Sequence, residues 1–130
     1  MGKARTVQSG TDATIITYGL GVQWAEAAAA ASGASIEIID LRTLLPWDEG
    51  TVFESVRKTN RALVLHEDTL TGGIGAELSA RIQEACWQDL DGPVKRVGGI
   101  DTAFPFAGTL EEQFLASSRL NEALSELLGA

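Results

Sequence analysis

The chain has 130 residues and a mass of 13.7 kDa, which suits a single domain with a core of its own. Its 45% apolar and 22% charged residues are typical of a globular protein and argue against disorder. Ten Lys and Arg residues against 18 Asp and Glu leave a net charge of −8, whereas proteins that hold nucleic acid concentrate positive charge. No apolar run approaches the roughly 20 residues that cross a bilayer. With no signal peptide visible and one cysteine, Cys86, we expect a protein of a reducing compartment, away from membranes.

Four short segments rich in β-branched and apolar residues recur along the chain. The first three are almost continuously apolar, which is typical of strands covered on both faces. The predicted strands are residues 13–18, 36–40, 62–66 and 94–97.

Segments with helical patterns lie between and after these strands. Residues 75–87 and 120–128 each place apolar side chains on one stripe, and residues 22–31 are dominated by alanine. Residues 51–58 begin with Thr51 and Glu54 at the spacing of a capping box. Thr109 and Glu112 predict the start of a further short helix before the last one.

Alternation of strands and helices predicts a three-layer α/β/α domain with a mostly parallel sheet over residues 1–130. The opening segment, residues 5–8, is separated from the first clear strand by the turn signal at residues 9–12. A tight turn of this kind joins antiparallel neighbours. We therefore predict one antiparallel edge strand in a five-stranded mixed sheet.

A strand, a glycine-rich loop and the start of a helix follow one another in residues 62–78. This order can present backbone N–H groups to a phosphate, so residues 71–75 could bind a nucleotide. However, Gly72, Gly73 and Gly75 lack the GxGxxG spacing, and no lysine follows them. The alternative is that these glycines permit a sharp turn and a close approach of helix to sheet.

His66, the one histidine, stands at the predicted end of the third clear strand, where open α/β sheets place functional groups. With Glu67 and Asp68 beside it, the imidazole could act as an oriented acid or base. The other interpretation is structural, a bond to a neighbouring loop or subunit. A metal site is disfavoured because consecutive strand residues point to opposite faces.

The remaining reactive residue types have structural interpretations. Cys86 lies on the apolar stripe of a predicted helix and is expected to be a buried thiol. Asp40 and Arg42 could bind a ligand, although an ion pair that holds their loop is the commoner use of such neighbours. No G-x-S-x-G elbow is present. We therefore assign no catalytic, cofactor-binding or metal-binding residue from chemistry alone.

Several of these segments, in order, resemble one family. The chain is similar to the transketolase C-terminal-like domain of the β subunit of the 2-oxo acid dehydrogenase E1 component. That family includes the pyruvate, branched-chain 2-oxo acid and acetoin dehydrogenases. The motifs that carry the resemblance are residues 10–19 (GTDATIITYG), 40–48 (DLRTLLPWD), 55–59 (SVRKT), 66–67 (HE), 71–77 (TGGIGAE), 92–97 (GPVKRV) and 99–102 (GIDT).

The resemblance implies a parent enzyme that uses thiamine diphosphate and Mg²⁺ to decarboxylate a 2-oxo acid and to transfer the acyl group to lipoyl-E2. It places the activating glutamate in a preceding pyrimidine-binding domain, and the diphosphate and metal on the E1 α subunit. This chain alone is therefore expected to be inactive and to hold no cofactor. Departures at Ala103, at Phe106 and at residues 116–118 leave the substrate open, with a preference for branched-chain acids.

The resemblance also implies partners: the E1 α subunit, a second E1 β subunit and the basic peripheral-subunit-binding domain of E2. We expect His66, Glu67, Gly72 and Gly73 to serve subunit or interdomain packing. Asp89, Asp91 and the carboxylate of Ala130 are expected to be solvated and to meet the basic E2 domain. A relative in the wider transketolase group, such as deoxyxylulose-phosphate synthase, and an autonomous phosphate-binding module are the alternatives. The expected location is the cytoplasm, or the mitochondrial matrix in a eukaryote.

Overall fold

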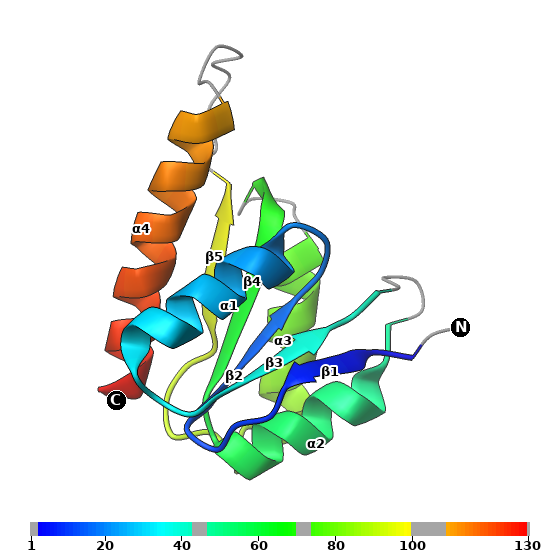
Figure 1. Ribbon diagram of the computed structural model, residues 1–130. Helices are drawn as coiled ribbons and strands as arrows, with labels where there is room; N and C mark the ends of the chain where they lie inside the picture. The colour runs from blue at the N-terminus through cyan, green and yellow to red at the C-terminus, as the bar shows by residue number, and fades with distance from the viewer. Residues whose placement is uncertain (1–2, 43–46, 70–73, 100–108, 130) are drawn as a thin grey trace.

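A computed structural model describes residues 3–42, 47–69, 74–99 and 109–129. Strands and helices alternate along the chain, as Figure 1 shows. The elements are β1 (Arg5–Gln8), β2 (Ala13–Thr17), α1 (Gly21–Ser32), β3 (Ile36–Asp40), α2 (Glu49–Thr59), β4 (Ala62–Thr69), α3 (Ile74–Cys86), β5 (Lys95–Gly99) and α4 (Thr109–Leu128).

The five strands form one mixed sheet in the order β1-β3-β2-β4-β5. The pairs β2–β3, β2–β4 and β4–β5 are parallel, and β1 runs antiparallel to β3 at one edge. The predicted architecture, a mostly parallel sheet with one antiparallel edge strand, is confirmed.

Two helices cover each face of the sheet (Figure 1). Alternate strand residues point to opposite faces, so Ile15 enters the core beneath α1 and α4, whereas Ile16 enters the core beneath α2 and α3. All five residues of β2 are buried, as is typical of a central strand covered on both sides. No helix among the described residues is long and apolar enough to cross a bilayer.

The edge strand β1 does not form a hairpin with β2, contrary to the expectation from the turn at residues 9–12. The central strand β2 already has β3 and β4 on its two sides, so β1 pairs with the free edge of β3. The connection therefore crosses the start of β3. A Cβ atom on Gly10 would lie 2.3 Å from the carbonyl carbon of Ile36, so the crossing requires glycine.

Two helix predictions need correction. The cap of α2 is Asp48, whose side chain accepts from the Thr51 N–H at 3.2 Å, so Thr51 is the third helical residue and not the cap. The two helices expected after residue 109 are one continuous helix, α4. Its sequence contains no glycine or proline between its ends to break it. The predicted bounds of β1 and β3 are met, and those of the other elements shift by one to three residues.

Candidate functional site

His66 lies in β4, and its imidazole packs against the first turn of α3. The residue is only 1% exposed. A Cβ atom on Gly75 would come within 2.2 Å of Nε2 and 2.4 Å of Cδ2 of this ring. Atoms cannot approach so closely, so glycine is needed at position 75 for the helix to reach the strand. This supports, for Gly75, the interpretation that glycine permits a close approach of helix to sheet.

The predicted packing group is only partly described. Glu67 belongs to β4, whereas Gly72 and Gly73 lie outside the described residues. The contact of His66 with Gly75 is made inside the domain, so the buried imidazole does not present itself at the surface. A role of His66 in subunit assembly would have to act through the position of α3, and it stays a prediction.

Two polar residues at the carboxyl ends of β2 and β3 have local roles. Arg42 adopts a left-handed backbone (φ 64°), and its N–H donates to Asp40 Oδ1 at 3.1 Å. The Asp40 carboxylate thus bonds the backbone at Arg42, and no side-chain ion pair joins these two residues in the described part of the chain. Thr17 Oγ1 is buried without a hydrogen-bond partner, but a Cβ on Gly21 would lie 2.0 Å from it. Helix α1 therefore fills the space that a ligand of Thr17 would need.

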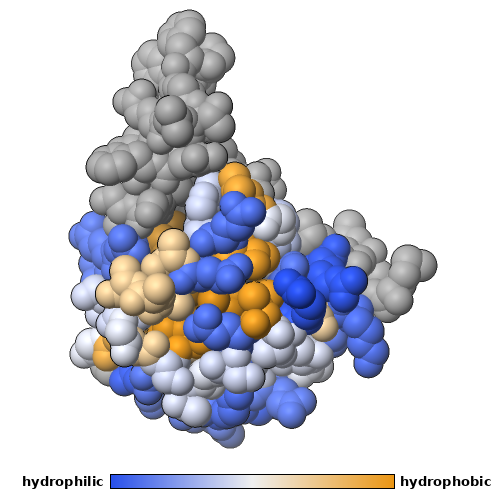
Figure 2. All heavy atoms as spheres, viewed as in Figure 1, coloured by the Kyte–Doolittle hydropathy of each residue, from blue (hydrophilic) through white to orange (hydrophobic). Residues whose placement is uncertain are grey.

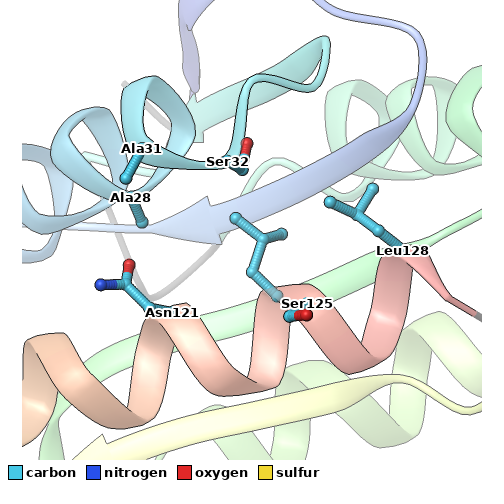
Figure 3. A pocket seen from close by; sticks show the side chains of 7 residues that line it. Ala28, Ala31, Ser32, Asn121, Ser125 and Leu128 are labelled. Atoms are coloured by element: carbon cyan, nitrogen blue, oxygen red, sulfur yellow. The ribbon is translucent and has the colours of Figure 1, made fainter.

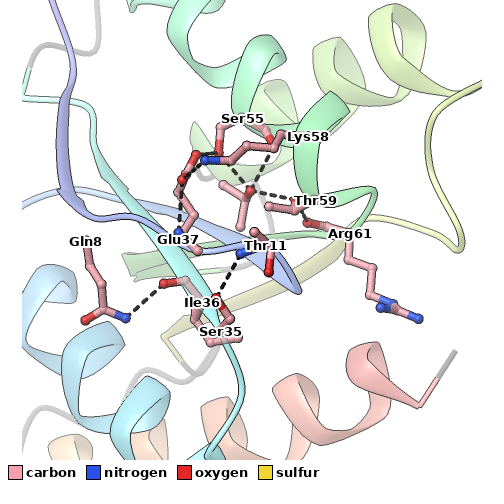
Figure 4. Close-up of polar contacts among 11 residues, drawn as sticks. Gln8, Thr11, Ser35, Ile36, Glu37, Ser55, Lys58, Thr59 and Arg61 are labelled. Atoms are coloured by element: carbon pink, nitrogen blue, oxygen red, sulfur yellow. Dashed lines mark hydrogen bonds and ion pairs between the residues drawn. The ribbon is translucent and has the colours of Figure 1, made fainter.

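A buried polar network lies at the opposite end of the sheet, where the parallel strands begin (Figure 4). We call this end of the strands the amino edge. Its centre is Glu37 of β3, which is 4% exposed. Ser55 Oγ donates to Glu37 Oε2 at 2.5 Å, and the Gly10 N–H donates to Oε1 at 3.1 Å. Lys58 Nζ also donates to Oε1 and forms an ion pair with it. The carboxylate therefore joins β3 to α2 and to the connection that precedes β2.

The hydroxyl groups of Thr14 and Thr59 extend the network behind Ser55. Thr14 Oγ1 lies 2.8 Å from Ser55 Oγ and 2.7 Å from Thr59 Oγ1. Each hydroxyl has one hydrogen, and that of Ser55 is given to Glu37. In the contact with Ser55 the donor is therefore Thr14, whose Oγ1 also lies 3.3 Å from the Ser55 carbonyl. Thr59 Oγ1 donates to the Arg61 carbonyl at 3.0 Å, and the same carbonyl accepts from the Thr14 N–H at 2.9 Å.

Burial opposes the ionisation of Glu37, but hydrogen bonds from Lys58, Ser55 and Gly10 outweigh it and hold the pKa of this carboxyl below its usual value. The group is an ionised acceptor whose partners are all donors. The packing of α2 over the network gives no substrate access to the Ser55 hydroxyl, which is buried. The arrangement therefore anchors α2 and does not resemble an activated nucleophile.

Our sequence interpretation missed this network. The signal was present, because Glu37 interrupts an otherwise apolar strand, residues 36–39, and an acidic residue is rarely buried without partners. What the sequence could not supply was the register that aligns Thr14 with Glu37.

Two of the predicted docking residues, Asp89 and Asp91, lie in a turn at this same amino edge. The Asp91 N–H donates to the Asn60 carbonyl at 2.8 Å, and Asn60 Nδ2 donates to the Asp89 carbonyl at 2.7 Å. Asp91 is exposed, as expected. Asp89 is not free, because its carboxylate lies 3.6 Å from Arg57 Nε. Ala130 lies outside the described residues.

Cys86 is fully buried in the core beneath α2 and α3, as predicted. Burial raises the pKa of its thiol, the nearby Asp89 adds to this effect, and Arg57 opposes it. A thiol in this environment is held as an inert apolar group.

A thiamine diphosphate site needs ligands for its metal ion and space for its diphosphate. They contain no group of three or more His, Cys, Asp or Glu side chains placed to hold a metal ion. At the start of α3, the imidazole of His66 occupies the space beside Gly75. Neither observation on the described residues provides a site for thiamine diphosphate or Mg²⁺.

Comparison with known proteins identifies the family. Residues 2–119 match the family described as "Transketolase, C-terminal domain". The chain is 50% identical over 109 residues to the mitochondrial 2-oxoisovalerate dehydrogenase subunit beta of Dictyostelium discoideum, which covers 81% of the chain and 30% of that protein. It is 41% identical over 132 residues to 2-oxoisovalerate dehydrogenase subunit beta of Bacillus subtilis, which covers 98% of the chain and 40% of that protein.

A pyruvate dehydrogenase E1 component subunit beta, from Rhizobium meliloti, is 40% identical over 115 residues, covering 86% of the chain and 25% of that protein. Among solved structures, a "Split gene transketolase, inactive beta4 tetramer" superimposes with a TM-score of 0.77 at 27% identity, over 98% of this chain and 42% of that one. The chain thus spans between 25% and 42% of the length of these proteins. It belongs to the transketolase C-terminal domain family, and its relatives at 40–50% identity are E1 beta subunits of 2-oxo acid dehydrogenases.

Proposed function

We propose that this chain is the C-terminal domain of an E1 β subunit in a thiamine-diphosphate-dependent 2-oxo acid dehydrogenase complex. The identity of 41–50% to 2-oxoisovalerate dehydrogenase β subunits carries the proposal and favours a branched-chain 2-oxo acid as the parent's substrate. The parent reaction is oxidative decarboxylation followed by acyl transfer to lipoyl-E2. The location would be the bacterial cytoplasm or, in a eukaryote, the mitochondrial matrix.

Within that enzyme, the domain serves assembly and docking and supplies no reacting group. Its partners are the E1 α subunit, a second β subunit and the peripheral-subunit-binding domain of E2. Thiamine diphosphate and Mg²⁺ are held by the other parts of the parent. The described residues support this division, because their buried polar groups anchor helices to the sheet.

The amino edge of the sheet supports the placement of the E2 site. Asp91 is exposed just before β5, and Lys95 at the start of β5 bonds Glu126 in the last turns of α4 at 3.0 Å. The Asp91 turn and the end of α4 therefore lie at one edge. Together with the net charge of −8, this edge would attract a basic domain.

Domain exchange tests the proposal. The chain replaces the corresponding segment of the Bacillus subtilis relative, which is then co-expressed with its α subunit. We expect the hybrid to assemble by size-exclusion chromatography and to decarboxylate 2-oxoisovalerate, while the isolated chain shows no heat of binding with thiamine diphosphate and Mg²⁺ in calorimetry.

The matched control is the same β subunit with this segment deleted, which should fail to assemble. An assembled hybrid that does not turn over, or tight cofactor binding by the isolated chain, would contradict the proposal.

A further inference from the structure

The two faces of the domain offer different surfaces to a partner. The hollow between α1 and α4 is lined by alanine, serine, asparagine and leucine side chains (Figure 3), so it holds no charged group that could select an occupant. Around α1, apolar side chains lie among hydrophilic ones (Figure 2), which is ordinary for a protein surface. The end of α3, which packs on the other face of the sheet, differs because a tryptophan is exposed there.

Trp87 directly follows α3 and is 62% exposed. In the part of the chain that the structure describes, it is the one large apolar side chain that is exposed. Hydrogen bonds hold the backbone on either side of it, because the Asp89 N–H donates to the Cys86 carbonyl at 2.8 Å and the Arg57 side chain donates to the Ala85 carbonyl at 3.2 Å. The indole is therefore presented to a partner on a backbone that is already ordered, which lowers the cost of binding.

Exposed carboxylates lie on both sides of Trp87 along the chain. Glu84 precedes it by three residues, the spacing that places two side chains on the same face of a helix, and the side chain of Glu84 is 68% exposed. Asp91 follows Trp87 by four residues and is exposed. None of the ion pairs between described residues involves Asp91. An aromatic surface with carboxylates beside it favours a cationic partner.

Two arginines at this surface already have carboxylate partners. Arg57 Nε lies 3.6 Å from Asp89, and Arg81 bonds Glu49 at 2.7 Å and Glu84 at 3.2 Å. With Asp91, four carboxylates stand against these two guanidinium groups. A second copy of the chain would bring the same carboxylates and a net charge of −8 of its own. Charge complementarity therefore favours a basic partner over self-association.

From these observations we infer that Trp87 is the main contact of the surface that docks the basic E2 domain. An arginine or lysine of that domain stacks on the indole, and Asp91 pairs with a second basic group beside it. Tryptophan is the best aromatic partner for a cation, and arginine is the cation most often found there. Trp and Arg are also the residue types that most often dominate the energy of an interface. The inference rests on the proposed E2 docking role and names the residue that holds the complex.

Three substitutions at position 87 test this role in the domain-exchanged E1. Surface plasmon resonance against the E2 domain that matches the exchanged subunit gives the affinity and both rates. We expect Trp87→Ala and Trp87→Leu each to bind about tenfold more weakly or worse, chiefly through faster dissociation. Trp87→Phe should recover most of the affinity, because phenylalanine keeps an aromatic face for the cation and leucine keeps only apolar area. The thermal midpoints of all three should stay close to that of the unmodified protein, because the side chain is exposed.

The other two tryptophans provide a matched control in the 130-residue chain itself. Trp24 and Trp47 are partly buried against the two cores. In two-dimensional NMR, the indole N–H signal of Trp87, assigned by its absence in Trp87→Phe, should shift when the E2 domain is added. The signals of Trp24 and Trp47 should stay in place.

The outcomes separate this inference from the docking role on which it rests. If the unmodified E1 binds the E2 domain but Trp87→Leu binds as well as Trp87→Phe, or if all three indole signals shift alike, Trp87 is not the contact and the docking role stands. If the assembled, unmodified E1 does not bind the E2 domain, the docking role and this inference both fail. A dimer of the chain that Trp87→Ala dissociates would also overturn the inference, since the occupant would then be a second copy.

Discussion

Gly75 and His66 pack so closely that no side-chain atom can be added at position 75 without movement. Replacing Gly75 with alanine places a methyl group 2.2 Å from the imidazole Nε2, so either the ring or α3 must move. Overpacking of this kind costs about 1–3 kcal/mol of the free energy of unfolding. Urea denaturation followed by circular dichroism measures it.

Gly50→Ala is the control for that variant. A Cβ at position 50 would meet only Asp48 Oδ1, at 3.8 Å, and alanine favours the helix by about 0.5–1 kcal/mol. The control should therefore be neutral or stabilising. In the double variant His66→Ala and Gly75→Ala the imidazole is absent. The added methyl group should then lower the free energy of unfolding by much less than it does when His66 is present. Additive losses would show that the two residues do not meet as described.

The ionised carboxylate of Glu37 makes the stability of the domain depend on pH. Its folded pKa lies below the ordinary value of 4.5, so its contribution is complete above that value and is lost as the pH falls through the folded pKa. Glu37→Gln should lower the free energy of unfolding near neutral pH by about 1–3 kcal/mol. The loss should lie toward the lower end, because the Lys58 side chain is 48% exposed and can be solvated.

Denaturation of both proteins between neutral and acidic pH checks this prediction. The unmodified chain should lose stability on acidification more steeply than the Gln variant, until the two curves approach each other. Glu54→Gln, on the exposed face of the same α2, should leave the curve unchanged. Parallel curves for the unmodified chain and Glu37→Gln would contradict the assigned role.

At the scale of elements, α2 is held by its cap and by polar contacts as well as by apolar packing. Its buried residues are the apolar Val52 and Val56 and the polar Ser55 and Thr59, and Phe53 is partly buried against the same core. Asp48 accepts from Thr51 Oγ1 at 2.6 Å and from the Ala4 N–H at 3.0 Å. These bonds hold the pKa of Asp48 below its usual value, although burial opposes them.

Asp48→Ala should therefore destabilise the domain by about 1–2 kcal/mol. Asp48→Asn, which keeps a capping oxygen, should recover most of that loss. The comparison of thermal midpoints at neutral pH measures both. An alanine variant as stable as the asparagine variant would show that the cap contributes nothing.

The sequence supported the order of elements because their patterns are local. Strands covered on both faces are runs of apolar residues, as in β2, and helices have apolar stripes, as in α3. The features that the sequence did not predict depend on contacts between segments far apart in the chain. The pairing of β1 with β3 depends on which strand edge is free, and the Glu37 network depends on the alignment of β2, β3 and α2. The His66–Gly75 contact likewise depends on the fold, whereas the glycine-rich pattern around it was visible.

At the scale of the whole molecule, the amino ends and the carboxyl ends of the parallel strands differ in what lies beside them. His66 and the start of α3 lie toward the carboxyl end of β4, while Glu37, the Asp91 turn and the carboxyl ends of α1 and α4 lie at the amino edge. The amino edge is anchored internally by hydrogen bonds and ion pairs. Because these bonds hold the edge and Asp91 is exposed beside them, the proposed docking surface should change little on binding.

The proposed E2 site makes a prediction about association rates. Asp91 is exposed and its backbone, not its carboxylate, makes the recorded hydrogen bond to Asn60, so Asp91→Lys should leave the fold intact. Reversal of a charge at the rim of an interface acts mainly on the association rate and on its dependence on salt. We expect slower binding of the basic E2 domain, about tenfold at low ionic strength, and a flatter dependence on salt. Surface plasmon resonance of the domain-exchanged E1 against the E2 domain at several ionic strengths measures both.

Asp89→Lys is the less direct test, because it also breaks the contact with Arg57 and should lower stability. Glu54→Lys on α2 is the matched control, since it adds the same charge at an exposed position away from the turn. If Asp91→Lys and Glu54→Lys slow association equally, the net charge of the domain attracts E2 and the Asp91 turn is not the site.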